Sequence, residues 1–322
     1  MKRRTTFIRT LAALSALAPV LAACSAGTTD AGGEGGRTVG LIRFSGSDVY
    51  ANSALDAIAA YGKSKGWTIT EVDANGSVDS ANTALTNLAT KGVDAIATSV
   101  FPTDALATGV ASAQAAGIPV ANWGGGLGPG VPIAADVAIG APMAERVVND
   151  LGGEGALLAL GYRPGLPCQR REKALEEAVA KTGIQMDAQQ ITIPGQVESA
   201  YKATQAWAQA RPRGGRLAVW SCFDDPATGA VAALQQLGRT DVRTYGLNGT
   251  AEALALVKAG KLTATQWIDG PSQGREIARL LEKYWAAPKD FKPVEIDGDY
   301  KIIDKTNVDG FLADHPELSK SS

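Results

Sequence analysis

Aromatic, carboxylate and amide side chains follow the ends of several predicted strands. Only 6% of the 322 residues are aromatic, yet rings recur at these positions beside polar groups. The candidates placed in this way are Asp48, Tyr50, Trp123, Phe223, Asp224, Asn248 and Trp267. Aromatic rings give a large contact area, and carboxylates and amides accept hydrogen bonds from hydroxyl groups. These residue types predict noncovalent binding of a small hydroxylated ligand.

The sequence leaves a structural alternative open for each of these candidates. Asp48 could cap the helix that follows it, and Asp224 could belong to a helix start next to a proline. Trp123 and Trp267 could be packing residues of the core. Asn248 could serve the tight turn after it, because asparagine tolerates the left-handed backbone region.

Composition argues against catalysis. The chain has one histidine, His315, and three cysteines, so a Ser-His-Asp triad, a multi-histidine metal site and a four-cysteine zinc cluster are improbable. Asp224 and Asp225 are adjacent at a predicted helix start and point in different directions, which disfavours a hydrolytic carboxylate pair. We expect His315 to be solvated, and we predict no enzyme activity, no cofactor and no metal.

Helix-like and strand-like segments alternate from residue 37 onward. The predicted strands are 39–44, 67–72, 94–99, 118–122, 155–160, 188–193, 216–221, 242–247 and 262–268. The predicted helices are 52–65, 80–91, 103–116, 140–151, 169–182, 198–210, 226–237, 250–259 and 272–286. This alternation predicts an α/β fold of βαβ units, with parallel sheets covered by helices on both faces. Such sheets bind ligands beyond the carboxyl ends of their strands.

Length and charge set further limits. A chain of 322 residues with 45% hydrophobic content has enough material for about two domains with substantial cores. The formal net charge of −2 gives no electrostatic reason to expect a nucleic-acid partner.

The N-terminus has the features of an export signal. A basic head is followed by the apolar run Leu11–Ala23, which is shorter than the ~20 residues of a membrane-spanning helix. Leu21-Ala-Ala-Cys24 resembles the lipobox of bacterial lipoproteins, which implies removal of residues 1–23 and acylation of Cys24. A signal peptide of another type, with Cys24 incidental, is the alternative. Segment 24–36 is predicted to be a flexible tether, about 20 Å in r.m.s. length. The expected location is extracytoplasmic, lipid-anchored to the bacterial cell membrane.

Cys168 and Cys222 remain after Cys24 is assigned to the lipid. An even number of cysteines in an oxidising compartment favours a disulfide. By the loop-closure model, this disulfide would stabilise the folded state by about 4 kcal/mol. Two separate buried thiols are the alternative.

Four stretches carry a family resemblance. They are Gly117-Ile-Pro-Val120, Asp224-Asp-Pro-Ala-Thr-Gly-Ala230, Gly246-Leu-Asn-Gly-Thr250 and Ala259-Gly-Lys-Leu-Thr-Ala-Thr265. By their order and spacing over residues 37–304, the chain resembles substrate-binding proteins of bacterial ABC importers, of the ribose- and galactose-binding type. The resemblance implies two doubly wound parallel-sheet lobes joined by a three-crossing hinge, the type I periplasmic binding protein fold. It places the crossings near 135–136, 268–269 and 295–296. The implied lobes are 37–135 with 269–295, and 136–268 with 296–322.

The resemblance also assigns site residues one at a time. Asp48 and Tyr50 occupy the polar and aromatic places after the first strand, and Arg171 matches the family's arginine, with Arg170 as the alternative. Phe223-Asp224 stands where the family often has Asn-Asp. Asn248 replaces a carboxylate with an amide.

Two positions depart further from the family pattern. The family's hinge glutamine falls near Ile268, which Trp267 and Asp269 flank in this chain. Gly124 and Gly125 stand where sugar binders usually carry an Asp-Arg pair. These glycines could form a floppy loop or leave room for a bulkier ligand.

The resemblance implies a monomeric solute-binding lipoprotein that captures a sugar or polyol by hinge closure and delivers it to an ABC permease in the membrane. Contacts from both lobes would stabilise the closed form over the open one. The alternatives are a ligand-sensing lipoprotein feeding a sensor kinase, a binder of a nucleoside or other non-sugar ligand, and an exported enzyme of related fold.

Overall fold

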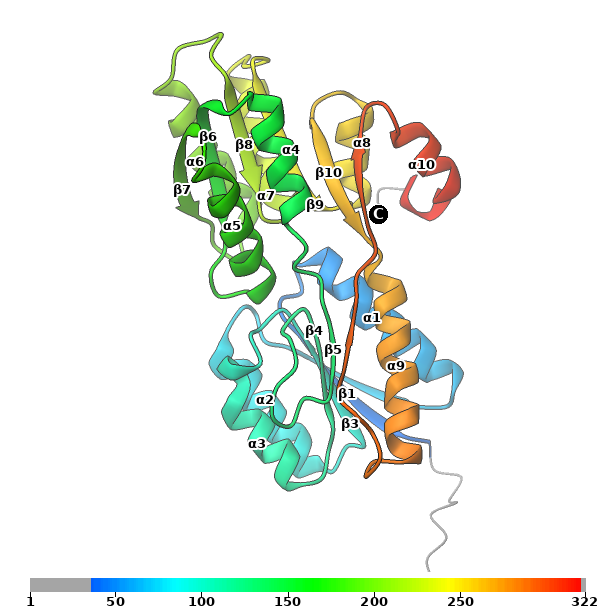
Figure 1. Ribbon diagram of the computed structural model, residues 1–322. Helices are drawn as coiled ribbons and strands as arrows, with labels where there is room; N and C mark the ends of the chain where they lie inside the picture. The colour runs from blue at the N-terminus through cyan, green and yellow to red at the C-terminus, as the bar shows by residue number, and fades with distance from the viewer. Residues whose placement is uncertain (1–35, 320–322) are drawn as a thin grey trace, which may run out of the picture. The chain divides into compact units, whose positions relative to one another are not determined.

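The computed structural model describes residues 36–319, so the predicted signal peptide, Cys24 and nearly all of the tether lie outside the described residues. The described chain contains two six-stranded sheets, ordered β11-β5-β4-β3-β1-β2 and β12-β10-β9-β8-β6-β7. We call the parts built on them the N-terminal lobe and the C-terminal lobe (Figure 1).

The N-terminal lobe is formed by the first part of the chain and one later excursion. Its strands are β1 (Thr38–Arg43), β2 (Thr68–Asp73), β3 (Ala95–Ser99), β4 (Val120–Trp123), β5 (Ile133–Ala135) and β11 (Val294–Ile296). Its helices are α1 (Val49–Ser64), α2 (Val78–Lys91), α3 (Ala107–Ala115), which follows the short 3₁₀ turn Asp104–Leu106, and α9 (Gly270–Ala286). All its strand pairs are parallel.

The C-terminal lobe repeats this organisation. Its strands are β6 (Glu154–Gly161), β7 (Gly183–Gln190), β8 (Leu217–Ser221), β9 (Val242–Asn248), β10 (Ala264–Ile268) and β12 (Tyr300–Asp304). Its helices are α4 (Ala141–Leu151), α5 (Leu166–Val179), α6 (Gln196–Gln209), α7 (Asp224–Gln236), α8 (Ala251–Lys258) and α10 (Val308–Asp314), with a final 3₁₀ turn at Pro316–Ser319. Its strands pair in parallel except for the antiparallel pair β10–β12.

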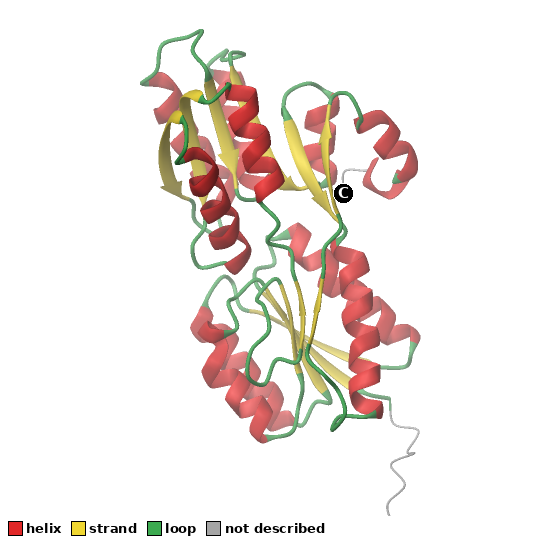
Figure 2. Ribbon diagram, in the orientation of Figure 1, coloured by secondary structure: helices red, strands yellow, loops and turns green. Residues whose placement is uncertain are grey.

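Helices flank the sheets of both lobes (Figure 2). In the N-terminal lobe α1 packs with α9 and α2 packs with α3, while in the C-terminal lobe α4 packs with α5 and α6 with α7. Strands β3, β4 and β8 are buried at every position, as expected of parallel strands covered on both faces. None of the helices within residues 36–319 combines the length and the apolarity that crossing a membrane requires.

The alternation predicted from the sequence is confirmed, with local differences. The strand predicted at 188–193 lies at 183–190 as β7, where most side chains are partly or fully exposed, so no apolar run marked it. Strands β5 and β11 have three residues each, which is too short for a periodicity to be visible. Strand β12 and helix α10 were also not predicted.

The chain passes between the two sheets three times. The first passage is at 136–140, between β5 and α4, and the second is at Asp269, between β10 and α9. The third is at 297–299, between β11 and β12. Each passage leaves a strand at its carboxyl end, so the carboxyl edges of the two sheets face each other across the passages.

Candidate functional site

A cavity lies between the two lobes, at the carboxyl ends of their central strands. It is lined by Phe44, Asp48, Tyr50, Val100, Trp123, Val137, Tyr162, Gly165, Pro167, Cys168, Arg171, Ile193, Phe223 and Asn248. The space open to the centres of water-sized spheres is about 40 Å³, within about 390 Å³ of space that protein atoms leave free and that is partly open to solvent. Six of the eight predicted ligand residues lie on this cavity: Asp48, Tyr50, Trp123, Arg171, Phe223 and Asn248. Their contact with a ligand stays a prediction.

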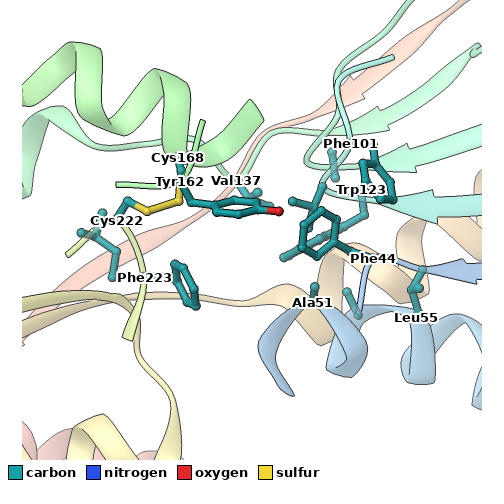
Figure 3. Close-up of a cluster of buried hydrophobic side chains, with 14 of the residues drawn as sticks. Phe44, Ala51, Leu55, Phe101, Trp123, Val137, Tyr162, Cys168, Cys222 and Phe223 are labelled. Atoms are coloured by element: carbon teal, nitrogen blue, oxygen red, sulfur yellow. A yellow bond between two sulfur atoms is a disulfide. The ribbon is translucent and has the colours of Figure 1, made fainter. Parts of the chain in front are cut away.

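Aromatic rings form much of the wall. In Figure 3, Tyr162 extends from the side of the cavity that holds the disulfide toward Phe44 and Trp123. Tyr50 and Trp123 meet edge to face, with ring centroids 5.2 Å apart. The Tyr50 hydroxyl donates to the Ile268 carbonyl at 2.9 Å, and the Trp123 indole N–H donates to Gln273 Oε1 at 3.0 Å. Both side chains therefore use their hydrogen-bond donors within the protein and offer mainly their rings to the cavity.

Arg171 is the cation of the cavity wall. The side chain is 2% exposed, and Nη1 donates to Asn248 Oδ1 at 3.0 Å and to the Cys222 carbonyl at 2.7 Å. Nη2 donates to the Val137 carbonyl. All three acceptors are neutral, and burial lowers the pKa of Arg171. The alternative, Arg170, is 47% exposed and lies 3.7 Å from an Asp136 carboxylate oxygen instead.

Asp48 caps a helix and also lies on the cavity wall. Its Oδ1 accepts from the Ala51 backbone N–H at 3.0 Å and so caps α1, and the residue also lines the cavity. By surface area Asp48 is only half-buried, but protein atoms surround its carboxyl group closely, and this burial raises the pKa of Asp48 to about 7. The Asp225 carboxylate adds to this rise, and Arg171 opposes it.

Asn248 also combines two roles. It ends β9 with a positive φ of 124°, a region that L-residues rarely occupy, and the turn continues through Gly249. Its amide oxygen accepts from Arg171, which holds the guanidinium against the cavity. The turn and the polar wall are thus built by one residue.

Two predicted ligand residues do not lie on the cavity wall, and Asp224 is the first. It is fully buried and is absent from the cavity wall. Its carboxylate accepts from the Thr250 N–H and from the Thr265 hydroxyl, both at 2.7 Å. It ties the start of α7 to the β9–α8 turn and to β10, which is a structural role. Burial raises the pKa of Asp224 to about 6, although these hydrogen bonds act in the opposite direction.

Trp267 is the second predicted ligand residue that lies away from the cavity wall. Its ring packs against Phe311 and His315, with centroid distances of 5.2 and 4.9 Å, and it does not reach the cavity wall. The covering side chains come from Phe311 of α10 and from His315, directly after that helix. The expectation that His315 is solvated is wrong. Its side chain is 30% exposed and packs against the rings of Trp267 and Phe311.

Several wall residues were not predicted as ligand contacts. Phe44 and Tyr162 come directly after β1 and β6, so the rule that selected Asp48 and Trp123 could have found them. Val137 and Ile193 lie in segments between elements, where no strand end in the sequence signals a position on the cavity.

The glycine turn after β4 is tightly packed. Gly124 has a φ of +83°, and a Cβ there would lie 2.9 Å from Val137 Cγ2. A Cβ on Gly125 would lie 2.0 Å from Asn122 Nδ2 and 2.2 Å from the Phe101 carbonyl oxygen. The turn is therefore neither floppy nor a source of space for a bulky ligand, and both sequence interpretations of it are corrected.

A disulfide joins Cys168, on the first turn of α5, to Cys222, directly after β8, with Cα atoms 5.2 Å apart. Cys168 lines the cavity, and the Cys222 carbonyl accepts from Arg171. The crosslink thereby fixes the backbone that orients the arginine.

The lobes contact each other around the cavity. The Leu166 N–H donates to the Val100 carbonyl at 3.1 Å. Elsewhere on the rim Gln196 Nε2 donates to the Ser47 carbonyl at 3.2 Å and to Asp225 Oδ2 at 2.9 Å. Since each bond to a carbonyl joins one lobe to the other, the structure represents a closed arrangement.

The groups on the cavity wall are suited to noncovalent binding. Within residues 36–319 no group of three or more His, Cys, Asp or Glu side chains is placed to hold a metal ion. The cavity wall offers one carboxylate, one amide, one guanidinium and two phenol hydroxyls among aromatic and aliphatic surfaces, and the Tyr50 hydroxyl is already bonded to the Ile268 carbonyl. Such a wall can enclose a small hydroxylated molecule and bind it by stacking and hydrogen bonds.

The chain matches a known protein family and is similar to several known proteins. Residues 39–289 match the family model described as periplasmic binding protein domain. The xylitol-binding protein of Mycolicibacterium smegmatis is 28% identical over 319 residues, covering 95% of this chain and 87% of that protein. The ribose import binding protein RbsB of Bacillus subtilis is 27% identical over 284 residues, covering 82% of this chain and 87% of that protein. The structure of an ABC transporter solute-binding protein from Agrobacterium vitis with bound allitol is similar, with a TM-score of 0.80 at 25% identity, covering 87% of this chain and 99% of that chain.

Proposed function

This chain belongs to the periplasmic binding protein domain family, and from that premise we propose that it captures a small sugar or polyol between its lobes for an ABC importer. The observation that carries the proposal is the cavity itself. It is lined from both lobes, by Asp48 and Trp123 on one side and by Arg171 and Asn248 on the other. Relatives named for xylitol and ribose agree with this ligand class.

The mechanism is closure about the three passages between the lobes. A ligand that touches only one lobe gains little from closure, whereas one that contacts groups of both lobes stabilises the closed form. Asp48 accepts hydrogen bonds from ligand hydroxyls, while Arg171 and the Asn248 amide donate to them. The rings of Trp123 and Phe223 cover the carbon faces of the ligand.

The ligand leaves unaltered in this proposal. Asp48 is the one carboxylate on the cavity wall, and no histidine or unbonded thiol accompanies it there to form an acid–base or nucleophile–base pair. Opening of the lobes then returns the same molecule to a permease. Incubating the purified protein with its best ligand and finding a new product by chromatography would contradict this part.

The proposal extends to the membrane anchor and the partner. Support for the anchor comes from the sequence alone, from the apolar run Leu11–Ala23 and the Leu-Ala-Ala-Cys pattern that ends at Cys24. We infer a monomeric lipoprotein held outside the cytoplasm and working with an ABC permease. Mass spectrometry of the membrane fraction should find an acylated N-terminal cysteine, and Cys24→Ser should release the protein from the membrane.

A binding screen tests the central claim. Residues 37–322 would be titrated with pentoses, hexoses, pentitols, hexitols and nucleosides by thermal shift and then by isothermal calorimetry, since a ligand that binds only the folded state raises its apparent stability. We expect at least one sugar or polyol to bind and to reduce the radius of gyration in small-angle scattering. Binding of nucleosides alone, or no binding by any sugar or polyol, would overturn the proposal.

A further inference from the structure

Much of the cavity wall offers no hydrogen-bonding group to a ligand. Carbon or sulfur surface is presented by Phe44, Val100, Trp123, Val137, Pro167, Cys168, Ile193 and Phe223. Tyr50 and Trp123 direct their donors to Ile268 and Gln273, as described above. The polar groups left for a ligand are those of Asp48, Tyr162, Arg171 and Asn248.

These polar groups are themselves partly occupied. One Asp48 oxygen accepts from the Ala51 N–H. The Asn248 oxygen accepts from Arg171, whose two terminal nitrogens also donate to backbone carbonyls. The groups with free capacity are the second Asp48 oxygen, the Tyr162 hydroxyl, the Asn248 amide nitrogen and Arg171 Nε, which has no partner. A ligand hydroxyl that lies away from these groups meets only carbon or sulfur surface. A hydroxyl buried against carbon loses its hydrogen bonds to water without replacement.

One part of the wall is apolar throughout. The turn beside it, at Gly124 and Gly125, has no room for a polar side chain. A Cβ on Gly124 would meet Val137 Cγ2 at 2.9 Å, Pro167 Cγ at 3.1 Å and Val100 Cα at 3.9 Å, so these three residues lie together. We call Val100, Val137 and Pro167 the apolar patch. The positive φ of Gly124 disfavours any side chain at that position, and the packing around Gly125 leaves no room for one.

We propose that the cavity selects a deoxy sugar or deoxy polyol. In such a compound one end of the carbon chain is a methyl group instead of a hydroxymethyl group. The methyl end lies against the apolar patch, and the hydroxylated part meets Asp48, Arg171 and Asn248. This inference rests on the proposed function, because it specifies the ligand class of the same site.

Matched ligand pairs test the inference. Isothermal calorimetry would compare L-fucose with L-galactose, L-rhamnose with L-mannose, and the alditols of each pair. We expect the deoxy compound of at least one pair to bind at least tenfold more tightly than its parent. Affinity for fully hydroxylated compounds that equals or exceeds that for all the deoxy compounds would overturn the selectivity and leave sugar capture standing. No binding by any sugar or polyol would instead remove the proposed function, and the inference with it.

A substitution on the apolar patch locates the methyl end. Val137→Thr keeps the side-chain shape but adds a hydroxyl, so it should reduce the preference for the deoxy compound at least threefold. Val147→Thr makes the same change at a buried position of α4 and controls for lost stability. It should leave the preference unchanged, with folding of both variants checked by circular dichroism. A preference that stays the same in Val137→Thr would overturn the placement of the methyl end.

Discussion

The ring of Phe44 in the N-terminal lobe meets the ring of Tyr162 in the C-terminal lobe edge to face, with centroids 5.8 Å apart and planes at 84°. Each ring directly follows the strand next to an edge of its own sheet, β1 or β6. The contact therefore joins the two lobes at the wall of the cavity.

Removing the Tyr162 ring should weaken ligand binding. Tyr162→Ala removes an aromatic pair of a kind that contributes about 0.5–1.5 kcal/mol beyond its buried area, so affinity should fall roughly two- to tenfold. Tyr162→Phe keeps the ring and should retain more of the affinity. Isothermal calorimetry measures both, and an alanine variant that binds as tightly as the wild type would contradict the role of this contact.

Two tryptophans should respond differently to the same change. Trp123→Phe alters the cavity wall, whereas Trp267→Phe alters the packing on Phe311 outside it. Both should lower the free energy of unfolding, because each shortens a large packed side chain. Only Trp123→Phe should change ligand affinity. Equal effects on affinity would show that the cavity assignment is wrong.

Arg171 and its neighbour Arg170 provide a matched pair. Arg171→Lys loses the planar fork that reaches three acceptors. Hydrogen bonds to charged groups contribute about 1.5–3 kcal/mol, so affinity should fall roughly ten- to a hundredfold. Arg170→Lys, at a half-exposed position, should stay within about twofold, as surface ion pairs contribute little. Calorimetry of the two variants side by side gives the comparison.

Asp48 should make stability depend on pH. Its pKa is raised from 3.8 to about 7 in the folded protein, so between these values the folded state binds more protons than the unfolded state. The contribution of Asp48 to stability is therefore largest at low pH and declines as pH rises from about 4 to about 7. Asp224, whose pKa is raised to about 6, acts in the same direction.

Asp48→Asn isolates the Asp48 part of this effect, because asparagine caps helices equally well. Denaturant unfolding from pH 4 to pH 8 should show the variant gaining stability relative to the wild type as pH rises. Asp79→Asn, at the exposed start of α2, controls for the type of substitution. A constant difference between Asp48→Asn and the wild type over this range would refute the prediction.

The Cys168–Cys222 crosslink should stabilise the folded chain. The double variant Cys168→Ser, Cys222→Ser should lose about 4 kcal/mol in free energy of unfolding, as the loop-closure model estimates. Dithiothreitol should destabilise the wild type and leave the double variant unaffected. A thiol titration of unreduced, denatured protein that finds both cysteines free would show that the bond does not form.

Much of the architecture was accessible from the sequence because its signals are local. Helices α1, α2 and α4 bury residues at helical spacing, and β3, β4 and β8 read as short apolar runs. The short strands β5 and β11 gave no such signal, because three residues pair only where a neighbouring strand is already in place.

The sequence predicted part of the candidate site, and tertiary packing decided the rest. The sequence placed aromatic and polar residues at strand ends, and five of them lie on one cavity together with Arg171, which the family resemblance assigned. It could not separate Phe223 from Asp224 or Arg171 from Arg170, since neighbours on a helix point in different directions and only packing decides which faces the ligand. It could not foresee that α10 would cover Trp267.

The sequence by itself determined the alternation of strands and helices, and with it the edge of each sheet where ligand groups gather, because both follow from hydrophobic periodicity along the chain. Only the tertiary structure decided which of those groups share a cavity and how polar that cavity is. The packed turn at Gly124 and Gly125, the internal bonds of Tyr50 and Trp123, and the closure of one lobe on the other all arise between residues far apart in sequence. No local pattern records them.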